Sequence, residues 1–210
     1  MAHRRPEAGQ VPAVIAALFV ETNGAYFGLP EVDPWDVRRD AMLYEGPHPV
    51  VAHPPCSRWC QLAPMNEARY GHAVGDDGGA FAHALDCVRR FGGVLEHPAF
   101  SYAWPAHGLP IPARAWSRSL FDAGWVCEVS QSAYGHPARK LTWLYYVGEQ
   151  PPPQLRWHEV EPTAQVSFCG NHGDSELPRL GKRAASATPP EFRAILIDMA
   201  RSARGLGSCR

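Results

Sequence analysis

A short apolar run that ends in two prolines and a cysteine constrains the fold more than any other stretch of this chain. Val50-Val51-Ala52 is too short for a helix and is typical of a buried strand. Pro54 and Pro55 end that strand, because proline cannot extend a strand ladder. Cys56 then follows at the carboxyl end of the strand, the edge where open α/β sheets bind ligands. A thiol on such a rigid support suits a nucleophile, and the alternative is a structural cysteine on a turn.

Further apolar runs alternate with helical patterns along the chain, and their order predicts the fold class. Strands are expected at residues 11–20, 50–52, 93–95, 126–129 and 141–147. Helices are expected from Asp33 to about Tyr44, at 81–91, briefly near 116–120 and after the Thr188 to Glu191 capping box, with a loop over 61–79. This alternation predicts an α/β fold in which a sheet is flanked by helices.

The length of 210 residues favours one domain with a single sizeable core. We expect the α/β core to span residues 11–148. Residues 149–186 are rich in proline at their start and are expected to be irregular. Residues 187–204 are expected to form a C-terminal helix that packs on the core.

Charge and cysteine content limit the partners and the compartment. The formal net charge of −1 provides no basic field, so binding to DNA would need a local patch. The six cysteines are scattered and no signal peptide precedes them, which favours a reduced, cytoplasmic setting. No apolar run approaches the length of a membrane span, so no membrane partner is expected. Nothing in the sequence indicates an obligate protein partner.

Three chemically distinct groups follow predicted strands at regular intervals. Cys56, Glu96 and the Arg139-Lys140 turn lie about 40 residues apart, roughly one βα unit each time. We therefore expect a thiol, a carboxylate and a cation to meet at one edge of the sheet. A thiolate adds to C6 of a pyrimidine ring, a carboxylate holds the N3/N4 edge, and a cation holds the O2 carbonyl. Such a set is compatible with chemistry on a pyrimidine base.

These stretches resemble motifs of the DNA cytosine-5 methyltransferase family. His53-Pro54-Pro55-Cys56 is similar to the family's Pro-Cys nucleophile motif, and Leu95-Glu96-His97-Pro98 to its Glu-Asn-Val segment. The stretch at 134–148 resembles the strand that carries its base-binding arginine. Leu18-Phe19 with two later glycines resembles its first, cofactor-binding motif. The resemblance covers residues 14–148, and two of these stretches are also similar to phage and prophage proteins.

The resemblance implies a shortened, Rossmann-like sheet of the methyltransferase type and a group transfer to C5 of the base. In it, Cys56 attacks C6, Glu96 holds the cytosine, and Arg139 or Lys140 binds the carbonyl. S-adenosylmethionine is the implied cofactor, with DNA or a pyrimidine nucleotide as substrate. The residues implied to bind the cofactor are Phe19, Gly24, Gly28 and Asp33.

The chain also departs from the family pattern on the cofactor side. Glu21 and Asn23 stand where the family has two glycines that let the backbone approach the cofactor. The interval from Phe19 to Cys56 is about one βα unit shorter than in family members. Too little chain follows Gly148 for a usual target-recognition domain. The motifs that handle the base are therefore better preserved than those for the cofactor or the target sequence.

Two other functions are compatible with the same residues. His53, Cys56 and Cys60 have ligand-like spacing for a metal ion. The remaining ligands of such a site would come from His72, Cys87, Cys169 or His172. A third hypothesis is a catalytically inactive relative of the methyltransferases that binds a base or a nucleic acid.

Overall fold

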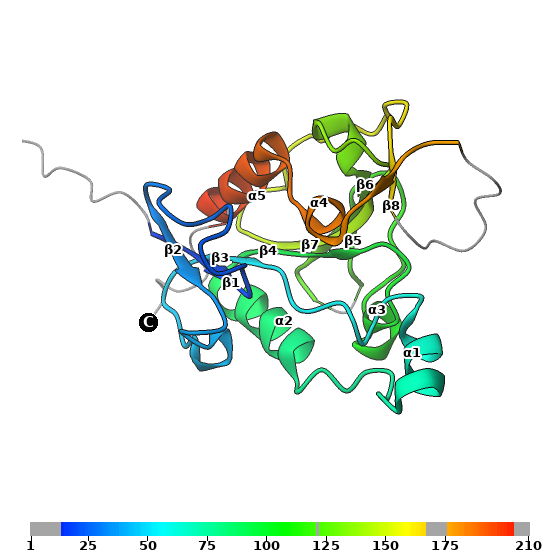
Figure 1. The fold of residues 1–210 in the computed structure, drawn as a ribbon. Helices are drawn as coiled ribbons and strands as arrows, with labels where there is room; N and C mark the ends of the chain where they lie inside the picture. Colours follow the sequence, from blue (N-terminus) through cyan, green and yellow to red (C-terminus); the bar gives the residue numbers. More distant parts are fainter. Residues whose placement is uncertain (1–13, 121, 167–175, 204–210) are drawn as a thin grey trace, which may run out of the picture.

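A computed structural model describes residues 14–120, 122–166 and 176–203, which form an α/β fold around a seven-stranded sheet (Figure 1). The strand order is β2-β1-β3-β4-β7-β6-β5. The strands are β1 (Ile15–Leu18), β2 (Val32–Trp35), β3 (Val50–Ala52), β4 (Gly93–Pro98), β5 (Ser117–Arg118), β6 (Trp125–Ser130) and β7 (Leu141–Val147). The helices are α1 (Ala63–Tyr70), α2 (Ala80–Phe91), α3 (Ala103–Ala106), α4 (Lys182–Ser186) and α5 (Pro190–Ser202), with 3-10 turns η1 (Ala41–Leu43) and η2 (Gln131–Tyr134).

The sheet is mixed, and its chain path reverses at β1. Strand β1 pairs in parallel with β2 on one side and with β3 on the other, and β3 pairs in parallel with β4. Strand β7 lies antiparallel between β4 and β6. From β1 the chain first forms β2 on one side of β1 and then crosses to form β3 on the other side. A topological switch point therefore lies between β1 and β3. In open α/β sheets, ligands bind outside the carboxyl ends of the strands at such a point.

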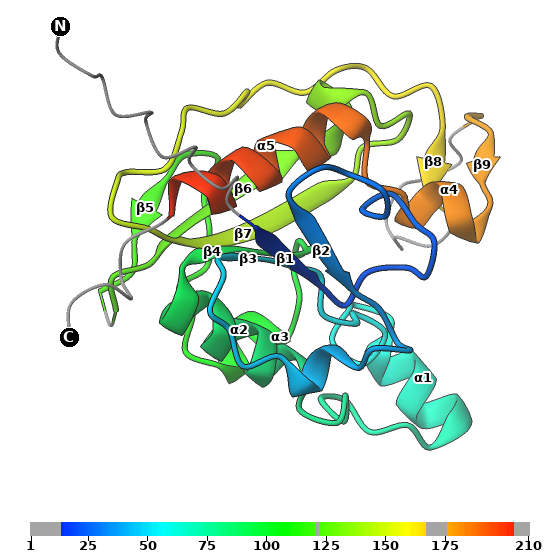
Figure 2. The same cartoon turned by 90° about the vertical axis from the view of Figure 1, so that its left-hand side faces the viewer.

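Helices cover both faces of the sheet, with α5 on one face and α2 and α3 on the other (Figure 2). Helix α2 buries Phe81, Leu85 and Val88, whose helical spacing places them on one side. Helix α5 buries an equivalent stripe that includes Phe192 and Leu196. Each such side chain contributes about 1.5–3 kcal/mol when it is removed from water. None of the described helices has both the length and the apolar composition needed to cross a membrane.

The structure confirms all five predicted strands and two of the helices. Strand β7 has the predicted bounds, β6 extends the predicted strand slightly, and β4 continues the predicted strand as far as Pro98. Strand β1 lies within the predicted range, and helices α2 and α5 are also present where expected. The capping box before α5 is not formed, because Pro189 occupies the N-cap position without a side-chain hydrogen bond.

The predicted helix over Asp33 to Tyr44 is wrong. Residues Val32–Trp35 form β2, and only the short turn η1 follows. Proline is tolerated at position 34 because β2 is an edge strand that pairs only with β1. Asp40 caps η1, and its carboxylate accepts a hydrogen bond from the Met42 amide at 3.1 Å.

Three further predictions need correction. The loop expected over 61–79 contains α1, which has Pro64 in its first turn and ends at Gly71 in the left-handed conformation. The helix expected near 116–120 is replaced by the short edge strand β5. The segment 149–186, expected to be irregular, contains the small parallel pair β8 (Gln165–Val166) and β9 (Arg179–Leu180), followed by α4.

Candidate active site

A cleft of about 1330 Å³ opens at the carboxyl ends of β1, β3 and β4, at the topological switch point. Its walls come from the turn after β1, the residues after β3, the end of β4 and residues 180–188 around α4. Strand β7 contributes its first residues, because it runs antiparallel to β4 and begins where β4 ends. Segments far apart in the sequence therefore surround one volume large enough for a nucleotide.

The cleft brings together the predicted chemical groups. Cys56, Glu96, Arg139 and Lys140 all line it. The charges of Glu96 and Lys140 both act on the pKa of the Cys56 thiol: Glu96 raises it and Lys140 lowers it. Of the residues predicted to bind a cofactor, Phe19 and Gly24 line the cleft, whereas Gly28 and Asp33 do not.

The two predicted cations have different environments. The Arg139 guanidinium forms a two-point ion pair with Glu159, with Nε 2.8 Å from Oε2, and this pair lies toward solvent. Lys140 instead donates from Nζ to the carbonyl oxygens of Ser186 at 3.1 Å and Ala187 at 3.0 Å. Burial lowers the pKa of Lys140, and the charges of Glu96 and Cys56 oppose this change. Lys140 is therefore the cation that acts on the thiol and the carboxylate.

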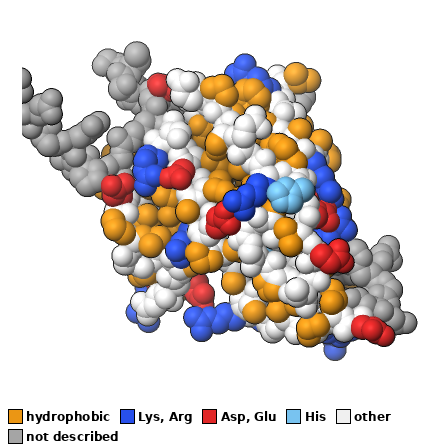
Figure 3. All heavy atoms as spheres, turned by 90° about the horizontal axis from the view of Figure 1, so that it is seen from above, with side chains coloured by type: hydrophobic (Ala, Val, Ile, Leu, Met, Phe, Trp, Pro, Cys, Tyr) orange, Lys and Arg blue, Asp and Glu red, His pale blue; other side chains and the backbone are white. Residues whose placement is uncertain are grey.

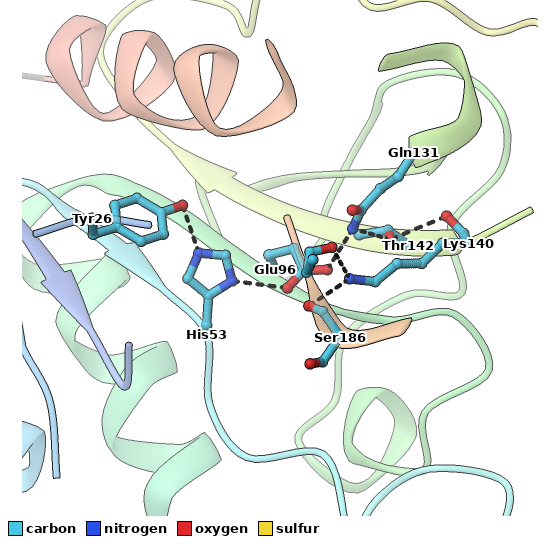
Figure 4. Close-up of polar contacts among 8 residues, drawn as sticks. Tyr26, His53, Glu96, Gln131, Lys140, Thr142 and Ser186 are labelled. Atoms are coloured by element: carbon cyan, nitrogen blue, oxygen red, sulfur yellow. Dashed lines mark hydrogen bonds and ion pairs between the residues drawn. The ribbon is translucent and has the colours of Figure 1, made fainter. Parts of the chain in front are cut away.

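Glu96 is buried and receives a donor on each carboxylate oxygen (Figure 4). Nδ1 of His53 lies 2.9 Å from Oε2, and Nε2 of Gln131 lies 3.1 Å from Oε1. Burial alone would raise the pKa of Glu96, but the hydrogen bond from His53 and the charge of Lys140 lower it to about 2. Glu96 is a carboxylate at neutral pH.

The hydrogen-bonded chain continues beyond both partners of Glu96. Nε2 of His53 lies 2.8 Å from the hydroxyl of Tyr26, whose pKa is raised by burial so that it remains a donor. With Tyr26 donating to Nε2, the imidazole has its hydrogen on Nδ1 and donates it to Glu96. Gln131 also donates from Nε2 to Oγ1 of Thr142 at 2.8 Å. The carboxylate is therefore held from two sides by residues that are themselves fixed.

Cys56 is half-buried on a well-defined turn. Its carbonyl accepts hydrogen bonds from the amides of Trp59 at 3.0 Å and Cys60 at 2.8 Å. Burial raises the pKa of the Cys56 thiol to about 11, the neighbouring Cys60 and Glu96 add to this increase, and Lys140 opposes it. The thiol is protonated at neutral pH. A ligand that neutralises Glu96 and draws Lys140 toward the sulfur would favour the thiolate.

The turn after β1 is shaped by its own backbone. Phe19 and Asn23 adopt the left-handed conformation, with φ of 59° and 55°. A Cβ atom on Gly24 would lie 2.7 Å from the carbonyl oxygen of Glu21, so this glycine is required by the close approach within the turn. Left-handed conformations at bulky residues such as Phe19 often accompany ligand sites.

The acidic side chains in and directly after β2 form contacts with neighbouring residues. Asp33 accepts a hydrogen bond from Nε1 of Trp35 at 3.0 Å and forms an ion pair with Arg39. Asp36 follows β2, at the position where dinucleotide-binding folds hold a ribose. Its carboxylate is buried and accepts from the Thr22 hydroxyl at 2.6 Å and from two backbone amides. Neither Asp33 nor Asp36 faces the cleft, so these residues do not fit the ribose of S-adenosylmethionine in this arrangement.

The metal hypothesis finds no support within the described part of the chain. There, no three histidine, cysteine, aspartate or glutamate side chains form a group able to hold a metal ion. His53 is engaged by Tyr26 and Glu96 rather than by cysteine. Cys169 and His172, two of the predicted ligands, lie outside the described residues.

Several residues of the site were not predicted for this role. His53 was considered only as a metal ligand, although its place directly before the two prolines signals that it lies at the strand end. Tyr26 lies on a turn without a motif, whereas Gln131 directly follows β6, and that position at a strand end was the signal that could have found it.

Comparisons of the chain with models of protein families, with curated proteins and with solved structures each gave no match. No relative therefore transfers an activity or a site residue to this chain. The geometry of the cleft carries the functional proposal.

Proposed function

We propose that this protein is an enzyme that acts on a pyrimidine base, with Cys56 as the nucleophile that adds to C6. The observation that supports the proposal is the meeting of a thiol, a carboxylate and a cation in one cleft. These three groups come from different strand ends, and each matches one part of the ring. A methyltransferase-type sheet belongs to the same proposal, supported by the cleft at the switch point between β1 and β3.

The hydrogen-bonding capacity of the site suits such a ring. An ammonium group has three N–H donors, and Lys140 uses two of them on the carbonyls of Ser186 and Ala187. The third remains for a ring carbonyl, where it would stabilise negative charge that develops during addition. Each oxygen of Glu96 accepts one hydrogen bond in the structure and has a second lone pair for a ring N–H group.

The proposed step begins when the thiol proton leaves to water and Sγ of Cys56 bonds to C6. The electron pair of the C5–C6 bond moves toward C5 and the ring edge held by Glu96 and Lys140. C5 then takes up a proton from water, and the reverse elimination restores the base with its C5 hydrogen exchanged. This exchange needs no cofactor, and a bound one-carbon donor would replace the incoming proton.

S-adenosylmethionine is the donor implied by the family resemblance. When bound, it would supply an electrophilic methyl group. Phe19 and Gly24 line the cleft, but Asp33, Asp36 and Gly28 lie outside it. The residues fit this cofactor only in part, and the proposed exchange at C5 does not depend on it.

The surface favours a small or single-stranded substrate. On the face that carries α5, acidic and basic side chains are interspersed with hydrophobic ones, and neither sign dominates (Figure 3). The formal net charge is −1. Non-specific affinity for duplex DNA comes from clustered cations that replace counterions. A base in a duplex would also have to be flipped out, at a cost of a few kcal/mol.

The test is release of tritium from nucleotides and oligonucleotides that carry 5-tritiated cytosine or uracil, with and without S-adenosylmethionine. We expect release by the wild type and by Cys60→Ser, and none by Cys56→Ser. A response to the cofactor would establish a methyltransferase. Absence of release from every substrate would contradict the proposed enzyme.

A base-binding protein without catalysis is the second candidate, favoured by the raised pKa of the Cys56 thiol. This candidate predicts that the wild type and Cys56→Ser bind pyrimidine nucleotides equally well and that neither releases tritium.

A further inference from the structure

The two donors on Glu96 define what this carboxylate offers to a ligand. His53 Nδ1 and Gln131 Nε2 occupy one lone pair on each oxygen. Both donors are fixed in turn, His53 by the Tyr26 hydroxyl and Gln131 by Thr142. A carboxyl group that accepts a hydrogen bond on each oxygen is stabilised in its ionised form. Glu96 therefore presents two acceptors and no donor to the cleft.

Lys140 presents the opposite chemistry beside it. Its remaining N–H is a donor, and it cannot accept. Glu96 can only accept hydrogen bonds and Lys140 can only donate them. We call these two side chains together the base-recognition edge of the cleft. A ring that matches both must carry an N–H group next to a carbonyl oxygen.

The two pyrimidine classes differ at this edge. Uracil has a hydrogen on N3 between two carbonyl oxygens, so it donates to a carboxylate and accepts from an ammonium at adjacent positions. Cytosine has a lone pair on N3, which would face the negative charge of Glu96 without a donor. Its amino group alone can donate to the carboxylate. A desolvated acceptor that is left unpaired beside a buried charge weakens binding.

We propose that the cleft selects pyrimidines that carry a hydrogen on N3, the uracil class, over cytosine. This inference rests on the proposed function, because it assigns the ring edge to Glu96 and Lys140. The expected preference is at least about tenfold in dissociation constant, as in sites that reject a ligand lacking one required hydrogen-bonding group. The family resemblance, which implies cytosine, points to the opposite choice.

The direct test is binding to the full-length protein at pH 8. Equilibrium dialysis would compare deoxyuridine and deoxycytidine monophosphates, and adenine oligonucleotides that contain a single uracil or a single cytosine. We expect tighter binding of the uracil member of each pair. Equal or tighter binding of the cytosine member would overturn the inference and leave the proposed function standing. Failure to bind any of the four probes would overturn both.

A substitution at Glu96 provides the second arm. In Glu96→Gln, the side chain offers one N–H donor and one carbonyl acceptor, which match N3 and the amino group of cytosine. His53 accommodates the change by moving its hydrogen from Nδ1 to Nε2. We expect the preference for uracil to be lost or reversed. An unchanged preference in a variant that keeps the wild-type circular dichroism spectrum would contradict the role of Glu96.

Glu21→Gln is the matched control. Glu21 also lines the cleft, but its exposed carboxylate lies 3.9 Å from Arg183 at the mouth rather than at the base-recognition edge. The control removes one negative charge while the donors and acceptors at Glu96 remain. The preference for uracil should persist in this variant, and its loss would show that charge alone explains the selection.

Discussion

Nδ1 of His53 lies 2.9 Å from Oε2 of Glu96, although 43 positions separate the two residues in the chain. This contact ties the segment that follows β3 to β4 at the rim of the cleft. Cys56 lies on that same segment, two prolines after His53. This interaction therefore couples the orientation of the carboxylate to the position of the segment that carries the thiol.

Alkylation of Cys56 should show how its neighbours act on the thiol. Because burial, Cys60 and Glu96 raise its pKa to about 11, its rate with iodoacetamide should increase about tenfold per pH unit between pH 7 and 10. Glu96→Gln should accelerate the reaction, and Lys140→Gln should slow it. Trypsin cleaves after Arg58, so mass spectrometry measures Cys56 and Cys60 on separate peptides. A rate that levels off near pH 8 would contradict the raised pKa.

His97 should make stability depend on pH. Burial lowers its pKa from 6.5 to about 4, and the charge of Glu96 opposes this change only in part. The unfolded chain therefore binds a proton between these values that the folded chain does not, so stability is complete above pH 6.5 and is lost as the pH falls toward 4. The loss is on the order of 3 kcal/mol.

Urea denaturation at pH 7.5 and pH 5 measures this dependence. His97→Gln should reduce the difference between the two pH values. The exposed His72, replaced in the same way, should leave it unchanged. Equal pH dependence in the wild type and in His97→Gln would show that other groups are responsible.

Tyr26→Phe should destabilise the fold by about 1–3 kcal/mol, because it leaves Nε2 of His53 without the hydroxyl that lies 2.8 Å away. Tyr70→Phe is the control, since Tyr70 is exposed on α1 and should change stability by less than about 0.5 kcal/mol. Chemical denaturation of both variants gives the comparison. Similar values for the two would mean that the Tyr26 hydroxyl bond adds nothing.

Gly93→Ala should be among the most damaging single substitutions. Gly93 has φ of 119°, and a Cβ atom there would lie 2.0 Å from the carbonyl oxygen of Val50 on the paired strand. Strands β3 and β4 would have to separate, so a loss above about 3 kcal/mol is expected. In Gly135→Ala, φ is 92° but no atom lies within 4 Å of the added Cβ, and the cost should be limited to about 1–2 kcal/mol of backbone strain. Thermal unfolding of the two variants separates steric from conformational cost.

Sequence patterns predicted the elements that carry a clear apolar signal, either a helical stripe or a continuous apolar run. Helix α2 and strand β7 have clear apolar patterns and clear ends, so both were predicted well. Strand β2 was missed because Asp33-Pro34 is typical of a helix start, and because an edge strand needs neither a full ladder nor a buried apolar run. Helix α1 was missed because only its first residue is buried, which leaves no apolar stripe.

The same contrast applies to the candidate site. Cys56, Glu96 and Lys140 were found because each follows or ends a recognisable strand, and strand ends meet at one edge of a sheet. Tyr26 was not found because it lies on a turn without a motif. Gln131 was overlooked although it directly follows β6, which ends at the same edge of the sheet as β4. The sequence did not show whether Arg139 or Lys140 is the cation of the site. The structure distinguishes them because Arg139 is paired with Glu159, a residue outside every motif.

Helix α5 has a consequence for how the chain is made. It follows every other element of the described chain, yet it covers the face formed by β1, β3 and β4. The ribosome therefore delivers the strands well before the helix that shields Val51 and Val94. Until α5 emerges, this apolar face has no cover and is a target for chaperones and for self-association. Nascent chains that stall after β7 should aggregate, and the native sheet should become soluble and protease-resistant only when synthesis has passed α5.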